Sequence, residues 1–249
     1  SYDGSVSNRN LASELYPQDN YYQYKSGGFL FRAGYQQVVW GEAFGLFYSD
    51  FINPKDLRLS PSAPSEFSRR SLPMVNIKMV GSSTSLQLLY APQSAYHLLP
   101  PPTRMFGANT LRSMYVSTID VRKSSAPNYF EKSEFGAKFG FTSSLADISV
   151  YYYNYDDRMP YYEQSSDSYF PYTIHLIEKH ERINSTGLAS AFEAGGFMFR
   201  AEFLQTRNKK INSISATGIG NFQANENVFV VSTEAPSMDN YIFSVQYSD

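Results

Sequence analysis

The chain has 249 residues, a formal net charge of −2 and no cysteine. These values exclude disulfides, thiolate metal sites and a cysteine nucleophile, and they provide no basic field that would attract a nucleic acid. Aromatic residues make up 16% of the chain, mainly 21 tyrosines and 19 phenylalanines. No run reaches the roughly 18 apolar residues of a membrane-spanning helix.

The first clear strand follows Gly27-Gly28, where alternate residues from Phe29 to Tyr35 are apolar and the residues between them are mostly polar. A period of two predicts a strand with one apolar and one polar face. The motif GGFMFRA at residues 195–201 nearly repeats GGFLFRA at 27–33, and it predicts the same kind of strand. Helical periodicity is interrupted throughout by glycine, proline, serine, β-branched and aromatic residues. The chain is therefore predicted to be all β.

The connections between the predicted strands alternate in length. Short turns are expected at residues 27–28, 81–83, 142–146, 194–196 and 235–238. Long segments separate them, including a Pro- and Ser-rich stretch to Leu72, an acidic and aromatic loop after Tyr155, and a polar loop from 206 to about 225. Because every second connection is short, we expect all five short turns to lie at one end of the sheet.

This pattern is typical of bacterial outer-membrane proteins, which have short periplasmic turns and long extracellular loops. It predicts an all-β fold, an antiparallel up-and-down transmembrane β-barrel, located in the bacterial outer membrane. The alternative is a set of hairpins in a soluble sandwich or a lipocalin-like barrel. With about ten strands visible, both ends would lie outside the cell, so we expect residues 1–249 to form a single barrel domain that is incomplete at both ends. The whole barrel would then have at least about twelve strands.

Several stretches resemble a family of large proteobacterial outer-membrane barrels. They are FRAGYQQVVWGEAFGLFYSDFINPKDLR, SRRSLPMVNIKMV, LQLLYAPQ, YYYNYDDRMPYY and NSTGLASAFEAGGFMFRAEF. Members of that family are often encoded beside resistance–nodulation–division transporters that export lipids or other hydrophobic molecules. The resemblance implies an outer-membrane barrel and an exporter complex as a partner.

The charged and amide side chains on the polar face of each strand are predicted to line the barrel lumen. They are Arg32, Gln36, Lys78, Lys138, Arg200 and Glu202. Rings of charge set ion selectivity in pores, so the arginines are candidates for that role. The alternative is a ladder of cross-strand pairs that fills the closed barrel.

Two further groups are candidates for recognition. Trp40, Glu42 and Asp56 are expected at the rim and in the first long loop, with Trp40 facing either the membrane interface or the lumen. Asp156, Asp157, Tyr161, Tyr162 and Glu163 of the third long loop combine flat rings with acceptors that suit sugars, amphiphiles or a protein surface. The alternative for the tyrosines is an interfacial girdle.

The sequence predicts no enzyme, no cofactor and no metal site. No serine lies in a Gly-x-Ser-x-Gly motif, and His175 and His180 fall on opposite faces of a strand. We therefore expect a porin-like channel or an export-associated barrel for amphipathic or lipid-like solutes. The alternative is a non-conducting structural or binding barrel within an envelope complex. The expected partners are outer-membrane lipid and envelope proteins, and no nucleic acid.

Overall fold

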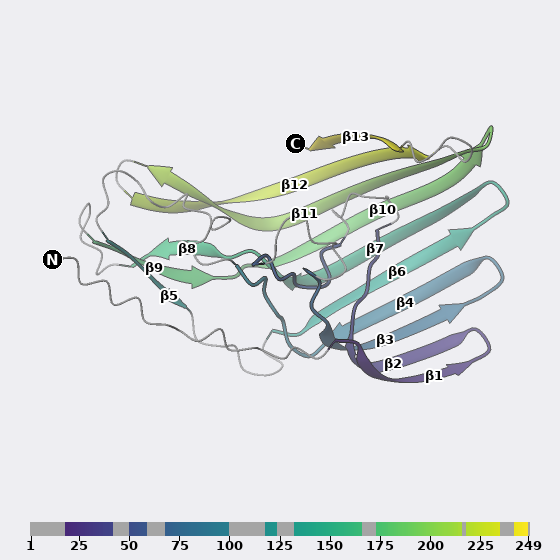
Figure 1. Ribbon diagram of the computed structural model, residues 1–249, viewed down its shortest axis with the longest axis horizontal. Coiled ribbons are helices and arrows are strands. Elements are labelled where there is room, and N and C mark those ends of the chain that lie inside the picture. The colour runs from purple at the N-terminus through teal and green to yellow at the C-terminus, as the bar shows by residue number, and fades with distance from the viewer. Residues whose placement is uncertain are drawn as a thin grey trace.

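The computed structural model describes residues 18–41, 50–58, 68–99, 118–123, 132–165, 173–215, 218–234 and 242–248. Thirteen strands run through them (Figure 1). The first six are β1 (Asn20–Ser26), β2 (Phe29–Gln36), β3 (Leu72–Val80), β4 (Thr84–Ala91), β5 (Thr118–Lys123) and β6 (Glu134–Thr142). The others are β7 (Ala146–Asp156), β8 (Tyr161–Gln164), β9 (Thr173–Lys179), β10 (Arg182–Ala194), β11 (Phe197–Ser215), β12 (Gly218–Glu234) and β13 (Ile242–Ser248). Within the described ranges, no helix is long and apolar enough to cross a membrane.

Ten strands form one antiparallel sheet in the order β1-β2-β3-β4-β6-β7-β10-β11-β12-β13. The strands follow one another along the chain, apart from β5, β8 and β9, which form a separate three-stranded sheet. This confirms the predicted all-β, up-and-down architecture. β1 and β13 are the edges of the large sheet in the part of the chain that the structure describes. Closure into a barrel stays a prediction.

The short turns lie together at one end of the large sheet, as predicted. Residues beside the turns pair across the strands, as in Thr84 with Phe141 and Met198 with Glu234. Since neighbouring strands are antiparallel, this register brings the hairpin turns to the same side, on the right in Figure 1. Residues 235–241 lie outside the described residues, but the flanking pair Glu234 and Ile242 is at this end. We call it the turn end, and the opposite side the loop end.

Backbone geometry explains the repeated glycine pair. Gly27, Gly195 and Gly196 have φ angles of 53°, 60° and 80°, in the left-handed region where glycine has no steric penalty. Gly28 has another reason to be glycine, since a Cβ there would lie 2.1 Å from the carbonyl oxygen of Val80 on β3. The two GGF motifs therefore specify tight hairpin turns.

The long connections differ from the prediction in three places. Residues 206–225 were expected to be a polar loop, but β11 and β12 continue through them as a hairpin arm that stops only at Ser215 and Gly218. The register shifts between Thr206 and Lys209, where Asn208 has a φ of 67°. The acidic and aromatic loop contains β8, which pairs with β9. The sequence predicts a strand from Phe29 to about Val39, but β2 ends at Gln36, because the chain then turns onto the sheet.

The large sheet has two different faces. The apolar face, which includes Phe29, Phe139 and Leu188, carries large hydrophobic side chains that are exposed. The covered face carries the side chains of the other alternate positions, and residues of the first long connection pack against it. The buried core lies on this covered face and contains Val38, Trp40, Ile52, Leu72, Met74, Leu89, Ala91, Tyr151, Tyr153, Tyr155, Ile183, Ala189, Leu204, Val228 and Val230. Phe31 and Phe199 are half-buried, and the side chain of Phe243 lies outside the described residues.

Candidate functional site

Two pieces of the first long connection, residues 37–41 and 50–58, lie against the covered face; we call them the inner segment. The side chain of Asn53, which is fully buried, joins the two pieces. Its Oδ1 accepts a hydrogen bond from the Val38 amide at 2.8 Å, and its Nδ2 donates to the Gln36 carbonyl at 3.2 Å and the Arg70 carbonyl at 3.0 Å. One asparagine therefore fixes the path of the chain as it leaves β2 and re-enters β3.

The inner segment packs its rings on an aromatic strip of β7, formed by Tyr151, Tyr153 and Tyr155. These tyrosines occupy alternate positions and are all buried. The ring centroid of Trp40 is 5.7 Å from those of Tyr151 and Tyr153, and that of Phe51 is 5.5 Å from Tyr155. Aromatic pairs at this separation stabilise a core beyond the burial of their area.

Glycines in the neighbouring strands make room for the aromatic strip. A Cβ at Gly136 of β6 would lie 2.2 Å from the ring of Tyr153, and a Cβ at Gly187 of β10 would lie 2.1 Å from the ring of Tyr151. Each tyrosine therefore lies across a glycine on the adjacent strand. This is why glycine occurs inside strands, where it otherwise weakens the pairing.

A buried ion pair fixes the inner segment from its other side. Arg158 follows β7, and Glu134 begins β6; their side chains are 3% and 0% exposed. Arg158 Nη2 lies 2.6 Å from Glu134 Oε2, which also accepts a hydrogen bond from the Tyr153 hydroxyl at 2.8 Å. The guanidinium also donates to the backbone carbonyls of Phe51, Ile52 and Ala95. Both charges are thus hydrogen-bonded, as buried ions must be if they are not to be destabilising.

Asp156 and Asp157 lie inside a packed cluster at the loop end. Asp156 Oδ2 accepts from the Tyr96 hydroxyl at 3.0 Å and lies 3.0 Å from Lys132 Nζ. Burial raises the pKa of Asp157, whose Oδ1 accepts from the Met159 amide at 3.0 Å. These two candidates for recognition are buried and hold loops together.

His180 stacks on Tyr96 in the same cluster, with centroids 3.5 Å apart and an interplanar angle of 6°. The nearby His97 accepts a hydrogen bond from the Lys55 amide at its Nδ1. Burial, followed by the positive charge of Arg158, lowers the pKa of His97 to about 3. His97 is therefore neutral at physiological pH.

The other three candidates of this loop, Tyr161, Tyr162 and Glu163, lie in β8. Tyr161 is buried beneath Lys210, whose Nζ is 4.7 Å from the ring centroid. The backbone of Tyr162 exchanges two hydrogen bonds with the side chain of Asn212 on the hairpin arm. Glu163 pairs with Lys179. The small sheet and the arm therefore contact each other, and the ring of Tyr161 is packed between them.

The six residues predicted to line a lumen all occupy strand positions whose side chains lie on the covered face. Lys138 Nζ donates to the Trp40 carbonyl at 2.9 Å, and Glu202 is buried. Gln36 is also buried, where its Nε2 donates to the Met74 carbonyl at 2.9 Å. Toward the turn end, Arg32 Nε donates to Gln23 Oε1 at 2.8 Å. Lys78 is exposed and Arg200 is half-buried.

The rim candidates have separate positions. Trp40 is fully buried on the covered face, with its Nε1 donating to Gln87 Oε1 at 3.0 Å, so it is not a residue of an interfacial belt. Asp56 pairs with Arg58; burial opposes ionisation, but the hydrogen bonds and charge of Arg58 outweigh it and lower the pKa of Asp56. Glu42 lies outside the described residues. Across the described ranges, no group of three or more acidic, histidine or cysteine side chains could hold a metal ion.

Sequence reasoning missed Arg158, Glu134 and Phe51. Arg158 stands in the motif DDRMP immediately after a strand, and Glu134 is an acid on the inward parity at the start of β6. Their pairing joins residues 24 positions apart, and no local pattern predicts it. The short turn at 142–146 already sets β6 beside β7, and the register of this hairpin together with the packing of both side chains against the inner segment brings the pair into contact.

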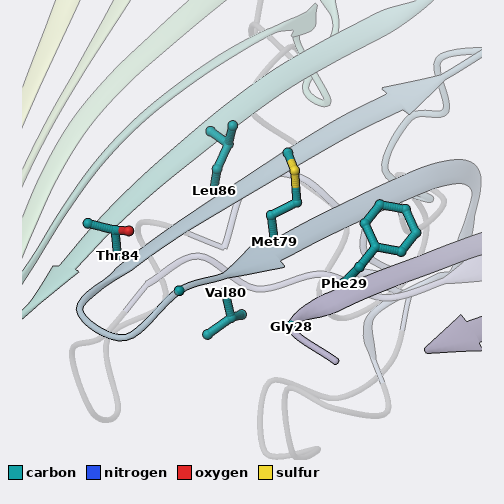
Figure 2. Close-up of a pocket in the computed structure, with 7 residues that line it drawn as sticks. Gly28, Phe29, Met79, Val80, Thr84 and Leu86 are labelled. Atoms are coloured by element: carbon teal, nitrogen blue, oxygen red, sulfur yellow. The ribbon is translucent and has the colours of Figure 1, made fainter. Parts of the chain in front are cut away.

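A shallow depression lies on the sheet at the turn end, with a volume of about 400 Å³ (Figure 2). Figure 2 shows Phe29, Met79 and Leu86 projecting from one side of three neighbouring strands, while Val80 points the other way. Its floor is therefore part of the apolar face.

The sequence match to a family model extends over most of these features. The model, described as "Protein of unknown function (DUF1302)", matches residues 8–241. The chain belongs to the DUF1302 family. This DUF1302 match covers the strands from β1 to β12, the inner segment and the Arg158–Glu134 pair. No curated protein and no solved structure matches the chain.

Proposed function

We propose that this DUF1302 protein forms the wall of a β-barrel in the bacterial outer membrane, with the apolar face toward lipid and the covered face toward the lumen. In this proposal it is a porin-like channel or an export-associated barrel for amphipathic or lipid-like solutes. The observation that supports it best is the apolar face.

Large apolar side chains form a continuous row across the middle of the apolar face. Phe139 pairs with Val150, Val150 with Leu188, Leu188 with Phe203, and Phe203 with Phe229. All five are between 40% and 49% exposed. A soluble monomer seldom exposes an apolar patch larger than a few hundred Å². Hydrocarbon is the environment in which such a surface is stable.

On β7 and β10 the apolar zone ends toward the loop end, and on β4 and β6 it reaches the aromatic side chains Tyr90 and Phe135. Along β7 the exposed side chains Ile148, Val150 and Tyr152 are followed by Asn154, which pairs with Asn184 on β10. A tyrosine at the edge of an apolar zone suits the interface between hydrocarbon and water. The zone thus fits strands that cross a bilayer in about 9 to 11 residues.

The composition of the covered face supports an amphipathic solute. This face carries Arg32, Lys78 and Lys138 as well as the aromatic strip and aliphatic side chains, and Lys138 lies directly opposite Tyr151 of the strip. A molecule with a charged head and an apolar body therefore meets complementary groups side by side on this face.

Spin labels on the two ends of the apolar face test the membrane position. Labels at Leu188 and Phe203 in protein reconstituted into liposomes should be accessible to oxygen and protected from a water-soluble nickel chelate. A label at Arg207, an exposed residue nearer the loop end, is the matched control and should show the reverse. High nickel accessibility at all three positions would favour the soluble alternative.

The second candidate is a non-conducting scaffold or binding barrel. It is favoured by the inner segment, which occupies the covered face and is fixed there by a buried ion pair. Folded protein that inserts into planar bilayers and never conducts would support this candidate.

A further inference from the structure

The inner segment covers a surface that is itself apolar. Beneath Trp40 and Phe51 lie the aromatic strip and, on β3 and β4, Met74 and Leu89, all of them buried in the core or packed against it. Elsewhere the same face carries charged and amide side chains. An apolar area on the face that we assign to the lumen is therefore closed by two rings from the chain's own first connection.

Backbone carbonyls are the only groups that the inner segment offers to Arg158. Its guanidinium contacts the carbonyl oxygens of Phe51 and Ile52, and its charge is balanced by Glu134 of β6. Removal of Arg158 would leave these carbonyls unpaired without cutting any apolar contact between the inner segment and the strip. Lys138 donates to the Trp40 carbonyl at the other piece of the segment. Arg158 is the charged group from the sheet that binds two consecutive carbonyls of the segment, at Phe51 and Ile52, so we take the ion pair as the lock of this piece.

We propose that the Arg158–Glu134 pair is a latch that holds the inner segment over the aromatic strip, and that the uncovered strip receives the apolar chain of an amphipathic molecule. The second half of this proposal rests on the proposed function, since it uses the lumen as the route to the strip. Trp40 and Phe51 occupy, in the closed state, the positions that the apolar chain takes in the open state.

Trp40 gives a direct readout of the latch, because it is the one tryptophan in the chain and lies 1% exposed against the strip. The full chain is folded in detergent micelles, and acrylamide quenching of its fluorescence is measured for the wild type and for Arg158→Met. We expect quenching to rise severalfold in the variant and the emission maximum to move to longer wavelength, while circular dichroism keeps the β content.

Arg182→Met is the matched control. Arg182 is another partly buried arginine at the loop end, and it donates to Asn154, Asp156 and the Ser133 carbonyl. Its replacement should leave Trp40 quenching at the wild-type level. If Arg158→Met does not fold, Glu134→Gln replaces it, because glutamine keeps one acceptor oxygen for the Tyr153 hydroxyl while it removes the charge and one of the two acceptors of Arg158. Unchanged quenching in the folded latch variant, or an equal rise in the control, would overturn the latch.

A spin-labelled fatty acid tests the occupant of the strip. 5-Doxylstearic acid quenches a nearby indole, so it should quench Trp40 more strongly in the latch variant than in the wild type or in Arg182→Met. If acrylamide reaches Trp40 in the latch variant and the fatty acid does not, the strip takes no apolar chain and that assignment is wrong. Both measurements work in micelles, so they separate a failure of the latch from a failure of the membrane proposal, which the liposome labels decide.

Discussion

At the scale of single residues, two glycines on the covered face leave the space in which tyrosine rings of β7 pack. Gly187 leaves the space that the Tyr151 ring fills, and Gly136 does the same for Tyr153. Sequence parity places these glycines on the polar side of their strands, where they look like weak positions. Their role becomes visible only when the ring on the next strand is known.

We expect Gly187→Ala to destabilise the fold by about 1 to 3 kcal/mol, because the added methyl group would overlap the Tyr151 ring in a packed core. Gly220→Ala is the control, since a Cβ there would meet no atom within 4 Å. Urea unfolding followed by fluorescence of the reconstituted protein measures both. Equal stability of the two variants would contradict the packing of Tyr151 over Gly187.

His97 should make stability depend on pH below neutrality. Its pKa is about 3 in the folded chain, against an ordinary value of 6.5, so the unfolded chain binds more protons between these values. Stability should therefore be complete above about pH 6.5 and fall as the pH decreases, by up to about 1.4 kcal/mol per pH unit. His97→Asn keeps an acceptor for the Lys55 amide and cannot be protonated. Its unfolding free energy, measured from pH 4 to 7, should vary less than that of the wild type; parallel curves would show that another group controls the effect.

At the scale of the strand, alternation assigns each side chain to a face, and register assigns its neighbours. Phe139 illustrates this, since parity predicts its outward direction and pairing places it between Leu86 and Val150. On β7 and β10 the exposed apolar series is interrupted at Asn154 and Asn184, two residues before the end of β7 and two residues after the start of β10. Local sequence thus specifies the face of each side chain.

Phe139→Arg should destabilise the protein in lipid bilayers by about 2 to 4 kcal/mol if Phe139 lies near the middle of the membrane, because arginine is poorly solvated there. Phe139→Leu is the control, as it keeps an apolar side chain at the same place. Reversible unfolding from liposomes gives the free energies. If the arginine variant is as stable as the leucine variant, Phe139 does not face hydrocarbon.

At the scale of the whole molecule, charged side chains and the inner segment lie on the same covered face, and Lys138 joins the two by its hydrogen bond to the Trp40 carbonyl. Arg32 and Arg200 each lie four residues beyond the second glycine of a turn, at similar depth on that face. The inner segment lies beyond them, toward the loop end. Permeation through the proposed lumen would pass both regions.

We expect Arg158→Met to conduct more than the wild type in planar bilayers, because its inner segment is released. Adding Arg32→Ala and Arg200→Ala to this variant should reduce its preference for anions, since fixed positive charge favours their entry. Reversal potentials in a salt gradient measure the preference. An unchanged preference would show that the two arginines do not line the conducting path.

Sequence alone determined the ten-stranded sheet up to the arm, its two faces and the common end of the short turns. These depend on period-two alternation and on glycine's access to positive φ, which are properties of a few consecutive residues. The same alternation places six side chains on the covered face: Arg32, Gln36, Lys78, Lys138, Arg200 and Glu202. Tertiary structure decided where the long connections go. Trp40 lies in the core, and Asp156 and Asp157 are buried beside other loops. Residues 206–225 form the arm of β11 and β12. Each of these positions depends on contacts with groups from distant strands. The Arg158–Glu134 pair likewise depends on the register of the β6–β7 hairpin and on the inner segment packed against it, and alternation within either strand encodes neither of these.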